Sequence, residues 1–215
     1  LGPGLLGNIY DGIGRPLKGL SETYGSYLDV GQSMRTLPED KEWNLHYLVS
    51  KGDSVKRGQV LATFEETGSI EHRLCSTQDG VIASECVDKS YKLDETVIAF
   101  EDGNSMTLSL KWPIRHSRPV KSRIDAKVPL ITGQRVIDTF FPIVKGGSAA
   151  IPGGFGAGKT MLQHQLAKWC DADIIVYIGC GERGNEMAQV LEEFSELVDP
   201  KTGRTLLERT ILIAN

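Results

Sequence analysis

The sequence predicts an α/β fold, in which part of a parallel sheet with a glycine-rich loop is joined by a β-rich, barrel-like insertion. Two observations predict this class. From Ser148 onward, apolar strand-like runs alternate with segments of helical periodicity, which is typical of a parallel sheet. Between about Ser21 and Arg118, short alternating runs are separated by glycines, which is typical of all-β structure.

The composition of the 215-residue chain is that of an ordinary soluble globular protein, with 40% hydrophobic and 24% charged residues. A net charge of −4 gives no electrostatic case for binding nucleic acid or a membrane surface. No apolar run approaches the roughly 18 residues that cross a bilayer, and the N-terminus does not read as a signal peptide. The four cysteines form no C-x-x-C pair, which fits reduced thiols in a cytosolic compartment.

Residues 24–118 are expected to form the β-rich insertion and to project from the α/β core. Strand-like runs at 52–62, 64–67, 79–83 and 95–100 resemble the flattened barrel of lipoyl- and biotin-carrier domains. Those domains carry their cofactor on a lysine at a hairpin tip. The tip expected here, Gly68-Ser69 after Glu66-Thr67, has no lysine. A small structural barrel that contacts partners is therefore favoured over a swinging-arm carrier.

Eight consecutive residues fit G-x-x-x-x-G-K-[ST], the loop that holds the phosphates of a nucleoside triphosphate. They are Gly153, Gly154, Phe155, Gly156, Ala157, Gly158, Lys159 and Thr160. Glycines let backbone N–H groups turn inward around an anion, so we expect these groups to converge at a helix N-terminus. Lys159 then places a positive charge on the β- and γ-phosphates, and the Thr160 hydroxyl binds Mg²⁺.

The residues around this loop favour phosphate binding over the alternative, a glycine-rich turn without a ligand. Residues 148–151 read as a short buried strand before the loop. A helical spacing follows it, at Met161, Leu162, Leu166 and Trp169. A loop between strand and helix is the context that phosphate binding requires.

The following elements extend the parallel sheet. Residues 173–179 predict a second strand, whose apolar core at 174–178 indicates burial on both faces. The next helix carries its apolar residues on one stripe: Met187, Val190, Leu191, Phe194 and Leu197. Residues 210–215 predict a third strand, and no helix follows it in this sequence. The first seven residues are rich in turn formers, and no element precedes them. We therefore expect this sequence to be a fragment of a domain.

Residues 179–186 leave the second strand at the edge where open α/β sheets place their reactive groups. Glu182 is a candidate to orient or deprotonate a water that attacks a γ-phosphate. Arg183 is a candidate to neutralise charge on the transferring group. The structural alternative is that the two side chains pair with each other or cap the next helix. The neighbouring phosphate loop favours catalysis.

Together these motifs resemble the catalytic A subunit of V-type and archaeal-type rotary ATPases. The resemblance rests on runs that occur in the family's order: 4–12 with 15–17, 129–138, 141–142, 146–147, the phosphate loop, and 179–187. It implies that residues 1–23 are the start of the nucleotide domain and a linker from a missing N-terminal barrel. Residues 24–118 are then the insertion, and 119–215 the first part of a truncated P-loop nucleotide-binding domain.

Two differences within the family favour the catalytic A subunit, and a third bears on the source. The F-type β subunit lacks the long β-rich insertion, and the non-catalytic B subunit lacks an intact P-loop. Ala157 stands where eukaryotic V-type subunits usually have a cysteine associated with redox inhibition, which favours an archaeal, bacterial or divergent eukaryotic source. The acidic strand for Mg²⁺, the adenine contacts and the C-terminal helical domain of the family are expected outside these residues.

The resemblance implies that ATP or ADP, with Mg²⁺, binds at an interface with the B subunit in an alternating A3B3 hexamer. Lys159 and the loop hold the phosphates, Glu182 positions the attacking water and Arg183 contacts the γ-phosphate. An arginine of the B subunit completes the site. Hydrolysis turns a central rotor stalk, while peripheral stator stalks contact the insertion. Protons or sodium ions then move through a separate membrane sector. The resemblance therefore implies that the protein lies on the cytoplasmic face of a membrane and that nucleic acid is not among its partners.

Two alternatives stay open at this point. The chain by itself is a candidate nucleotide-binding or docking module without turnover. A hexameric helicase or secretion ATPase shares a related core, but the insertion and the acidic charge disfavour it. The sequence does not distinguish proton from sodium transport, or ATP hydrolysis from synthesis.

Overall fold

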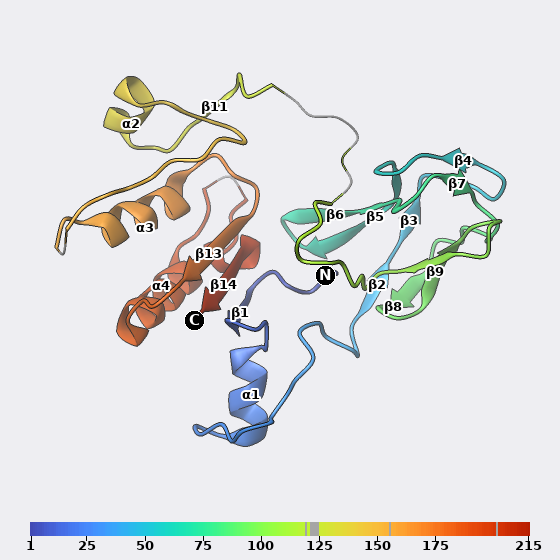
Figure 1. The fold of residues 1–215 in the computed structure, drawn as a ribbon, viewed down its shortest axis with the longest axis horizontal. Helices are drawn as coiled ribbons and strands as arrows, with labels where there is room; N and C mark the ends of the chain where they lie inside the picture. The colour runs from blue at the N-terminus through green and yellow to red at the C-terminus, as the bar shows by residue number, and fades with distance from the viewer. Residues whose placement is uncertain (119, 121–124, 155, 201) are drawn as a thin grey trace.

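The computed structural model describes residues 1–118, 120, 125–154, 156–200 and 202–215, and it consists of an α/β unit beside a β-rich unit (Figure 1). The chain starts between the two units and forms one strand of the α/β unit, followed by a helix that extends away from both units. It then builds the β-rich unit and returns for the remaining helices and strands. No helix in the described ranges has the length and apolarity to cross a membrane.

The α/β unit contains a parallel sheet of three strands in the order β1-β14-β13. The bounds are β1 Asn8–Asp11, β13 Ile175–Gly179 and β14 Thr210–Ala214. Both β1 and β13 run parallel to β14, and Leu212 lies between Ile9 and Tyr177 in the register. The predicted α/β class with a parallel sheet is confirmed, and the first strand comes from the N-terminal segment.

Helix α4, Gly184–Glu196, packs its apolar stripe against the sheet. Met187, Val190 and Phe194 are buried, and Leu191 and Leu197 pack beside them, which confirms the predicted stripe. Helix α3, Lys159–Trp169, and the 3-10 helix η1, Leu206–Arg209, complete this core. The periodicity of 3.6 therefore placed α4 correctly because its apolar residues recur over three turns.

Strand β13 is buried on one face only, so the prediction of burial on both faces is wrong. Ile175 and Tyr177 point into the core, whereas Val176 is 54% exposed and Ile178 is 56% exposed. Successive side chains of a strand point to opposite faces, and the apolar core lies against one face of β13. An apolar run shows that both faces of a strand can be buried. It does not show whether a second layer of structure covers the other face.

The predicted strand at residues 148–151 is also wrong: all four residues are described, and they form no strand and are largely exposed. Serine and alanine have low β-propensity and bury little apolar area, so this run gains little from pairing. Nearby, β11, Pro129–Leu130, and β12, Ile143–Val144, form an antiparallel pair around helix α2, Arg135–Phe140.

The apolar stripe expected on α3 is only partly right. Met161 and Trp169 are exposed, Leu162 and Leu166 are half-buried, and the buried positions are His164 and Ala167. The buried face is therefore turned away from the face that the apolar spacing indicated. A hydrogen bond between His164 and the Tyr177 hydroxyl of β13 explains this difference.

The β-rich unit consists of antiparallel strand pairs and one three-stranded antiparallel sheet around a single apolar core. Its strands are β2 Glu42–Asn44, β3 His46–Tyr47, β4 Ser54–Val55, β5 Val60–Thr67, β6 Ile70–Cys75, β7 Gly80–Val81, β8 Ser90–Lys92, β9 Thr96–Ala99 and β10 Ser105–Thr107. Trp43 and Phe64 are almost fully buried at its centre. The predicted hairpin tip lies at Gly68-Ser69, between β5 and β6.

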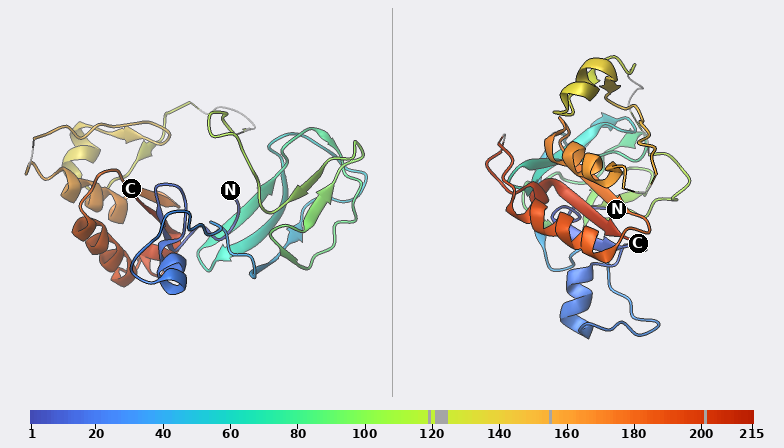
Figure 2. Two further views of the ribbon diagram at one scale, coloured as in Figure 1. Left: turned by 60° about the horizontal axis from the view of Figure 1, so that its bottom comes forward. Right: turned by 90° about the vertical axis from the view of Figure 1, so that its left-hand side faces the viewer.

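The two units lie side by side in Figure 1 and in the left view of Figure 2. Helix α1, Leu17–Tyr24, extends away from both, and residues 25–41, all of them described, contain neither helix nor strand. The predicted domain boundaries at 23/24 and 118/119 stay predictions. Pro119 in any case falls outside the described residues.

Candidate functional site

The phosphate-loop motif lies at the N-terminus of α3, as its sequence predicts. The helix begins at Lys159, and Gly158 is its N-cap with φ +79°. Gly156 also has a positive φ, of +77°. L-residues with a Cβ rarely adopt this left-handed region, so glycine is required at both positions for the chain to turn into the helix. Phe155 falls outside the described residues.

The ammonium group of Lys159 turns back into its own loop. It donates hydrogen bonds to the carbonyl oxygens of Gly153 and Gly154, the latter at 3.1 Å. The N–H of Ala157 donates to the Gly154 carbonyl at 3.4 Å, and that of Leu162 to the Gly158 carbonyl at 3.0 Å. The charge that the motif assigns to phosphate binding is thus held at the loop by backbone oxygens. Whether the loop N–H groups converge on one point stays a prediction.

Thr160 is the second residue of α3 and is half-buried. Thr160 therefore lies in the first turn of the helix, whose backbone N–H groups have no partner within the helix. Mg²⁺ is bound in nucleotide sites by one or two protein oxygens together with phosphates and water. A single hydroxyl at this place fits that requirement.

Glu182 follows β13 in a segment that is fixed by backbone hydrogen bonds to the end of β14. The N–H of Asn215 donates to the Gly179 carbonyl, and the N–H of Gly181 donates to the Asn215 carbonyl, both at 2.9 Å. Because the two strands are parallel, their carboxyl ends meet at one edge of the sheet. Glu182 therefore lies at the edge of the sheet that the sequence predicted.

The pKa of the Glu182 carboxyl is raised, first by a side-chain hydrogen bond with Glu186 and then by desolvation and the negative charge of Glu186. The positive charge of Lys159 acts in the opposite direction. Lys159, Glu182 and Glu186 thus form a cluster of interacting charges. The cluster combines two residues predicted from separate motifs with a third, Glu186.

Arg183 is the N-cap residue of α4, with an extended backbone. Its carbonyl accepts hydrogen bonds from the N–H groups of Glu186 at 3.0 Å and Met187 at 3.1 Å. The helix has no side-chain hydrogen bond at this N-cap. The Arg183 side chain therefore does not cap α4, and the choice between a catalytic and a structural role for Glu182 stays a prediction.

Sequence reasoning missed Glu186 as a member of the site, although it lies in the motif at residues 179–186. The available signal was its spacing, because Glu182 and Glu186 are four residues apart across the start of a helix and such pairs lie close together. A cavity of about 730 Å³ opens beside Glu182, and no described residue of the phosphate loop lines it. It is lined mainly by apolar residues of the helix and the sheet, including Ile9, Leu191 and Ala214.

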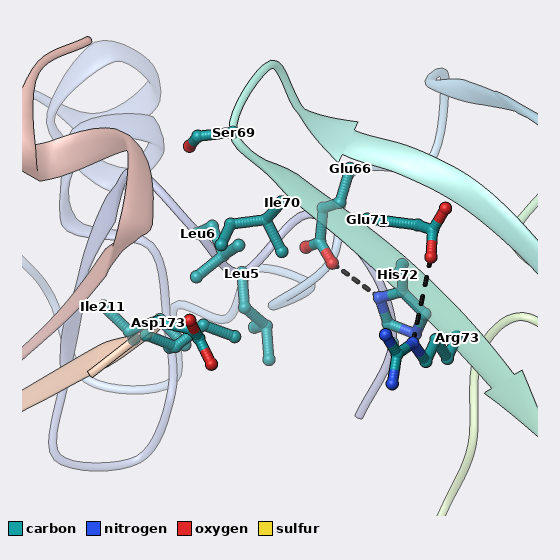
Figure 3. A pocket seen from close by; sticks show the side chains of 12 residues that line it. Leu5, Leu6, Glu66, Ser69, Ile70, Glu71, His72, Arg73, Asp173 and Ile211 are labelled. Atoms are coloured by element: carbon teal, nitrogen blue, oxygen red, sulfur yellow. Dashed lines mark hydrogen bonds and ion pairs between the residues drawn. The ribbon is translucent and has the colours of Figure 1, made fainter. Parts of the chain in front are cut away.

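A second cavity, of about 640 Å³, lies between the hairpin β5–β6 and the α/β unit (Figure 3). Leu5, Ile70 and Ile211 form apolar parts of its wall. Glu66 and His72 face each other there, with 2.6 Å between Oε2 and Nδ1. This cavity contains no described residue of the phosphate loop, so it does not belong to the candidate nucleotide site.

Family models match most of the chain. The nucleotide-binding domain of the ATP synthase alpha/beta family matches residues 133–215, and the barrel-sandwich domain of the same alpha/beta subunits matches residues 34–115. The first match contains the phosphate loop and Glu182. The second contains all the described strands of the β-rich unit.

Curated relatives match over the whole chain. A V-type ATP synthase alpha chain from Clostridium tetani is 51% identical, over 100% of this chain and 37% of its own length. The V-type alpha chain of Halothermothrix orenii and the A subunit of the A-type ATP synthase of Methanoculleus marisnigri are each 52% identical. Both matches cover 100% of this chain, and they cover 38% and 37% of the relatives' lengths. The chain thus spans little more than a third of the curated relatives that it matches.

Proposed function

Because the chain belongs to the ATP synthase alpha/beta family, we propose that the full protein is the catalytic A subunit of a V-type or A-type rotary ATPase. The observation that carries this proposal is the cluster at the carboxyl edge of the sheet. It brings Lys159 at the start of α3 within electrostatic range of Glu182 beyond β13. A phosphate-binding cation and a carboxylate are the two charges that attack on a terminal phosphate requires.

In the proposed reaction, the loop from Gly153 to Thr160 holds the triphosphate and Lys159 neutralises the β- and γ-phosphates. Glu182 orients a water molecule, whose oxygen bonds to the γ-phosphorus while the bond to the β–γ bridging oxygen breaks. Arg183 stabilises the charge on the transferring phosphoryl group. Mg²⁺ held by Thr160 adds further charge neutralisation when it is bound.

Lys159 gains a phosphate as a partner when nucleotide binds. Its ammonium has three donors, and two of them are directed at the carbonyls of Gly153 and Gly154. A phosphate offers a charge-assisted acceptor, which is a stronger partner than a neutral carbonyl. We infer that the carbonyls hold the ammonium near its working position until phosphate replaces one of them.

The relatives' subunit names support an assembly of several polypeptides, and we propose that the site is completed there. The B subunit would contribute an arginine in an alternating A3B3 hexamer. A central rotor stalk and peripheral stator stalks would couple turnover to transport of protons or sodium ions through a membrane sector. The working location would then be the cytoplasmic face of the membrane.

Turnover of the full-length protein with and without the B subunit tests this proposal. We expect ATP hydrolysis from the assembled A–B complex and little from either polypeptide alone, because the arginine is supplied in trans. Nucleotide binding without turnover in the complete assembly would instead support the docking-module alternative. RNA-stimulated hydrolysis would support a helicase and contradict the proposal.

A further inference from the structure

A buried histidine on α3 makes a hydrogen bond that the proposed reaction does not use. His164 is 3% exposed, and its Nε2 lies 3.0 Å from the hydroxyl oxygen of Tyr177 on β13. The two rings are also in edge contact, with centroids 5.5 Å apart. His164 lies one helical turn after Thr160, on the same face of α3.

Tyr177 connects this histidine to the other elements of the site. It lies in the middle of β13, two residues before the end of the strand, and it is 9% exposed. Its ring contacts Phe194 of α4 in an edge arrangement, with centroids 6.4 Å apart. The pair therefore lies where the helix that begins at the phosphate loop, the strand that leads to Glu182 and the helix that contains Glu186 meet.

Charged residues of the candidate site affect the pKa values of this buried pair. Burial raises the pKa of Tyr177, and the negative charges of Glu182 and Glu186 raise it further. Burial lowers the pKa of His164, while Glu193, Lys168 and Glu186 also act on its ring. Lys168 of α3 and Glu193 of α4 form an ion pair with each other. The surroundings thus favour a neutral imidazole next to a neutral phenol.

We propose that His164 and Tyr177 are positioning residues for the hydrolysis step. Their hydrogen bond fixes the position of α3 relative to β13, and so the position of Lys159 and Thr160 relative to Glu182. The inference rests on the proposed function, since it assigns a role within that same site. It concerns two buried residues.

The physical reason lies in the difference between polar and apolar contacts. Two apolar side chains at this interface can shift along each other at small cost, because dispersion contacts are non-directional. A buried hydrogen bond has one distance and one direction, and moving its partners apart leaves both groups unsatisfied in an apolar core. A displacement of about 1 Å between catalytic groups lowers rates by about 100-fold in other enzymes, so a fixed position has catalytic value.

The test uses the full-length protein assembled with its partner subunits. Tyr177→Phe removes one oxygen and keeps the ring against Phe194. We expect about a 10-fold or larger loss of kcat, with nucleotide affinity within about 3-fold of the parent. His164→Gln, which keeps a hydrogen-bonding end, should retain more activity than His164→Leu. Tyr91→Phe is the matched control, because it removes a similarly buried hydroxyl, bonded to the Val87 carbonyl in the β-rich unit, and should leave kcat unchanged.

The same substitution in a Glu182→Gln protein distinguishes a positioning role from a general loss of stability. In the Glu182→Gln protein the carboxylate is already gone, so Tyr177→Phe should lower the residual turnover by no more than about 2-fold. An equal fold-loss in both backgrounds, or parallel losses of kcat and nucleotide affinity, overturns the inference in favour of a structural role. Should Tyr177→Phe fail to assemble, the comparison of His164→Gln with His164→Leu decides in the same way. If Glu182→Gln itself keeps parental turnover, the site assignment fails, which is a distinguishable result.

Discussion

Glu66 accepts a hydrogen bond from the backbone N–H of Gly4, with 2.7 Å between Oε1 and nitrogen. Its other carboxylate oxygen bonds His72, whose ring stacks on Phe64 in the core of the β-rich unit. The bond joins the hairpin β5–β6 to the segment that leads directly into β1. A side chain of the insertion thus holds the start of the α/β unit.

Glu66→Ala should lower the free energy of unfolding by about 2–3 kcal/mol at neutral pH, because the Gly4 N–H and the His72 ring lose a charged partner. Burial alone raises the pKa of Glu66, but the hydrogen bonds from His72 and Gly4 outweigh it and leave the pKa lowered. This stabilisation is therefore present above the ordinary pKa of glutamate and disappears as the pH falls through the lowered value. Denaturant titrations near neutral pH and in strong acid measure the free energy of unfolding of parent and variant. The difference between the two should be smaller in acid. Glu65→Ala, at the adjacent exposed position, is the control.

Lys159→Ala should weaken ATP binding by about 10- to 100-fold, which corresponds to the loss of one charge-assisted contact of about 1.5–3 kcal/mol. Titration with a fluorescent nucleotide measures this directly. Lys111→Ala removes the same charge from an exposed position in another part of the chain and should bind like the parent. Unchanged affinity in Lys159→Ala would show that the loop does not hold phosphates.

Glu182→Gln should keep the fold and the nucleotide affinity but lower turnover of the assembled enzyme by about 100-fold or more. Glutamine has the size of glutamate and can still bond Glu186, whereas it cannot serve as an anionic base. Steady-state hydrolysis beside nucleotide titration separates the two properties. Turnover within a few-fold of the parent would mean that Glu182 is structural.

The stability of the α/β unit should fall in mild acid because of His164. Its lowered pKa means that the unfolded chain takes up a proton at a higher pH than the folded chain does. Stability is therefore complete above the ordinary pKa of histidine and decreases below it. Tyr177, Glu193, Glu186 and Lys168 are the titratable groups that act on this ring or bond to it.

Urea midpoints measured from about pH 8 to about pH 5, on either side of the ordinary histidine pKa, report this effect. His164→Gln should show a shallower decline than the parent across this range. His116→Gln, at an exposed position, should follow the parent. A His164→Gln curve as steep as that of the parent would mean that other groups cause the acid loss.

Much of the fold could be predicted because it follows from the local periodicity of apolar residues and from the order of the motifs. Helix α4 was predicted with its buried face, since Met187, Val190 and Phe194 recur at the helical period. The burial of β13 could not be predicted from Val176 and Ile178, because cover on a sheet face depends on layers far away in the sequence. On α3, the apolar spacing indicated the wrong face, since the partner of the buried histidine lies on another element.

The candidate site divides in the same way. The motif predicted that α3 starts at the phosphate loop, and the end of the second strand predicted the place of Glu182. The hydrogen bonds of Lys159 to its own loop carbonyls, and the closeness of Glu182 to Glu186, depend on three-dimensional geometry. The spacing of Glu182 and Glu186 indicates only the second of these features, and no pattern of residue types specifies the first. The roles of these residues stay predictions until the variants are measured.

The pairing of β1 with β14 has a consequence for how the chain folds. Asn8 faces Ile211 in that ladder, so β1 cannot pair with β14 until synthesis has passed β14. The β-rich unit between them is built from pairs that are closer in sequence, and contacts between distant segments form slowly because a long loop has to close. During synthesis we expect the β-rich unit to gain protection from hydrogen exchange first, while β1 stays unpaired. Its free edge is a hazard for association with other nascent chains in that interval.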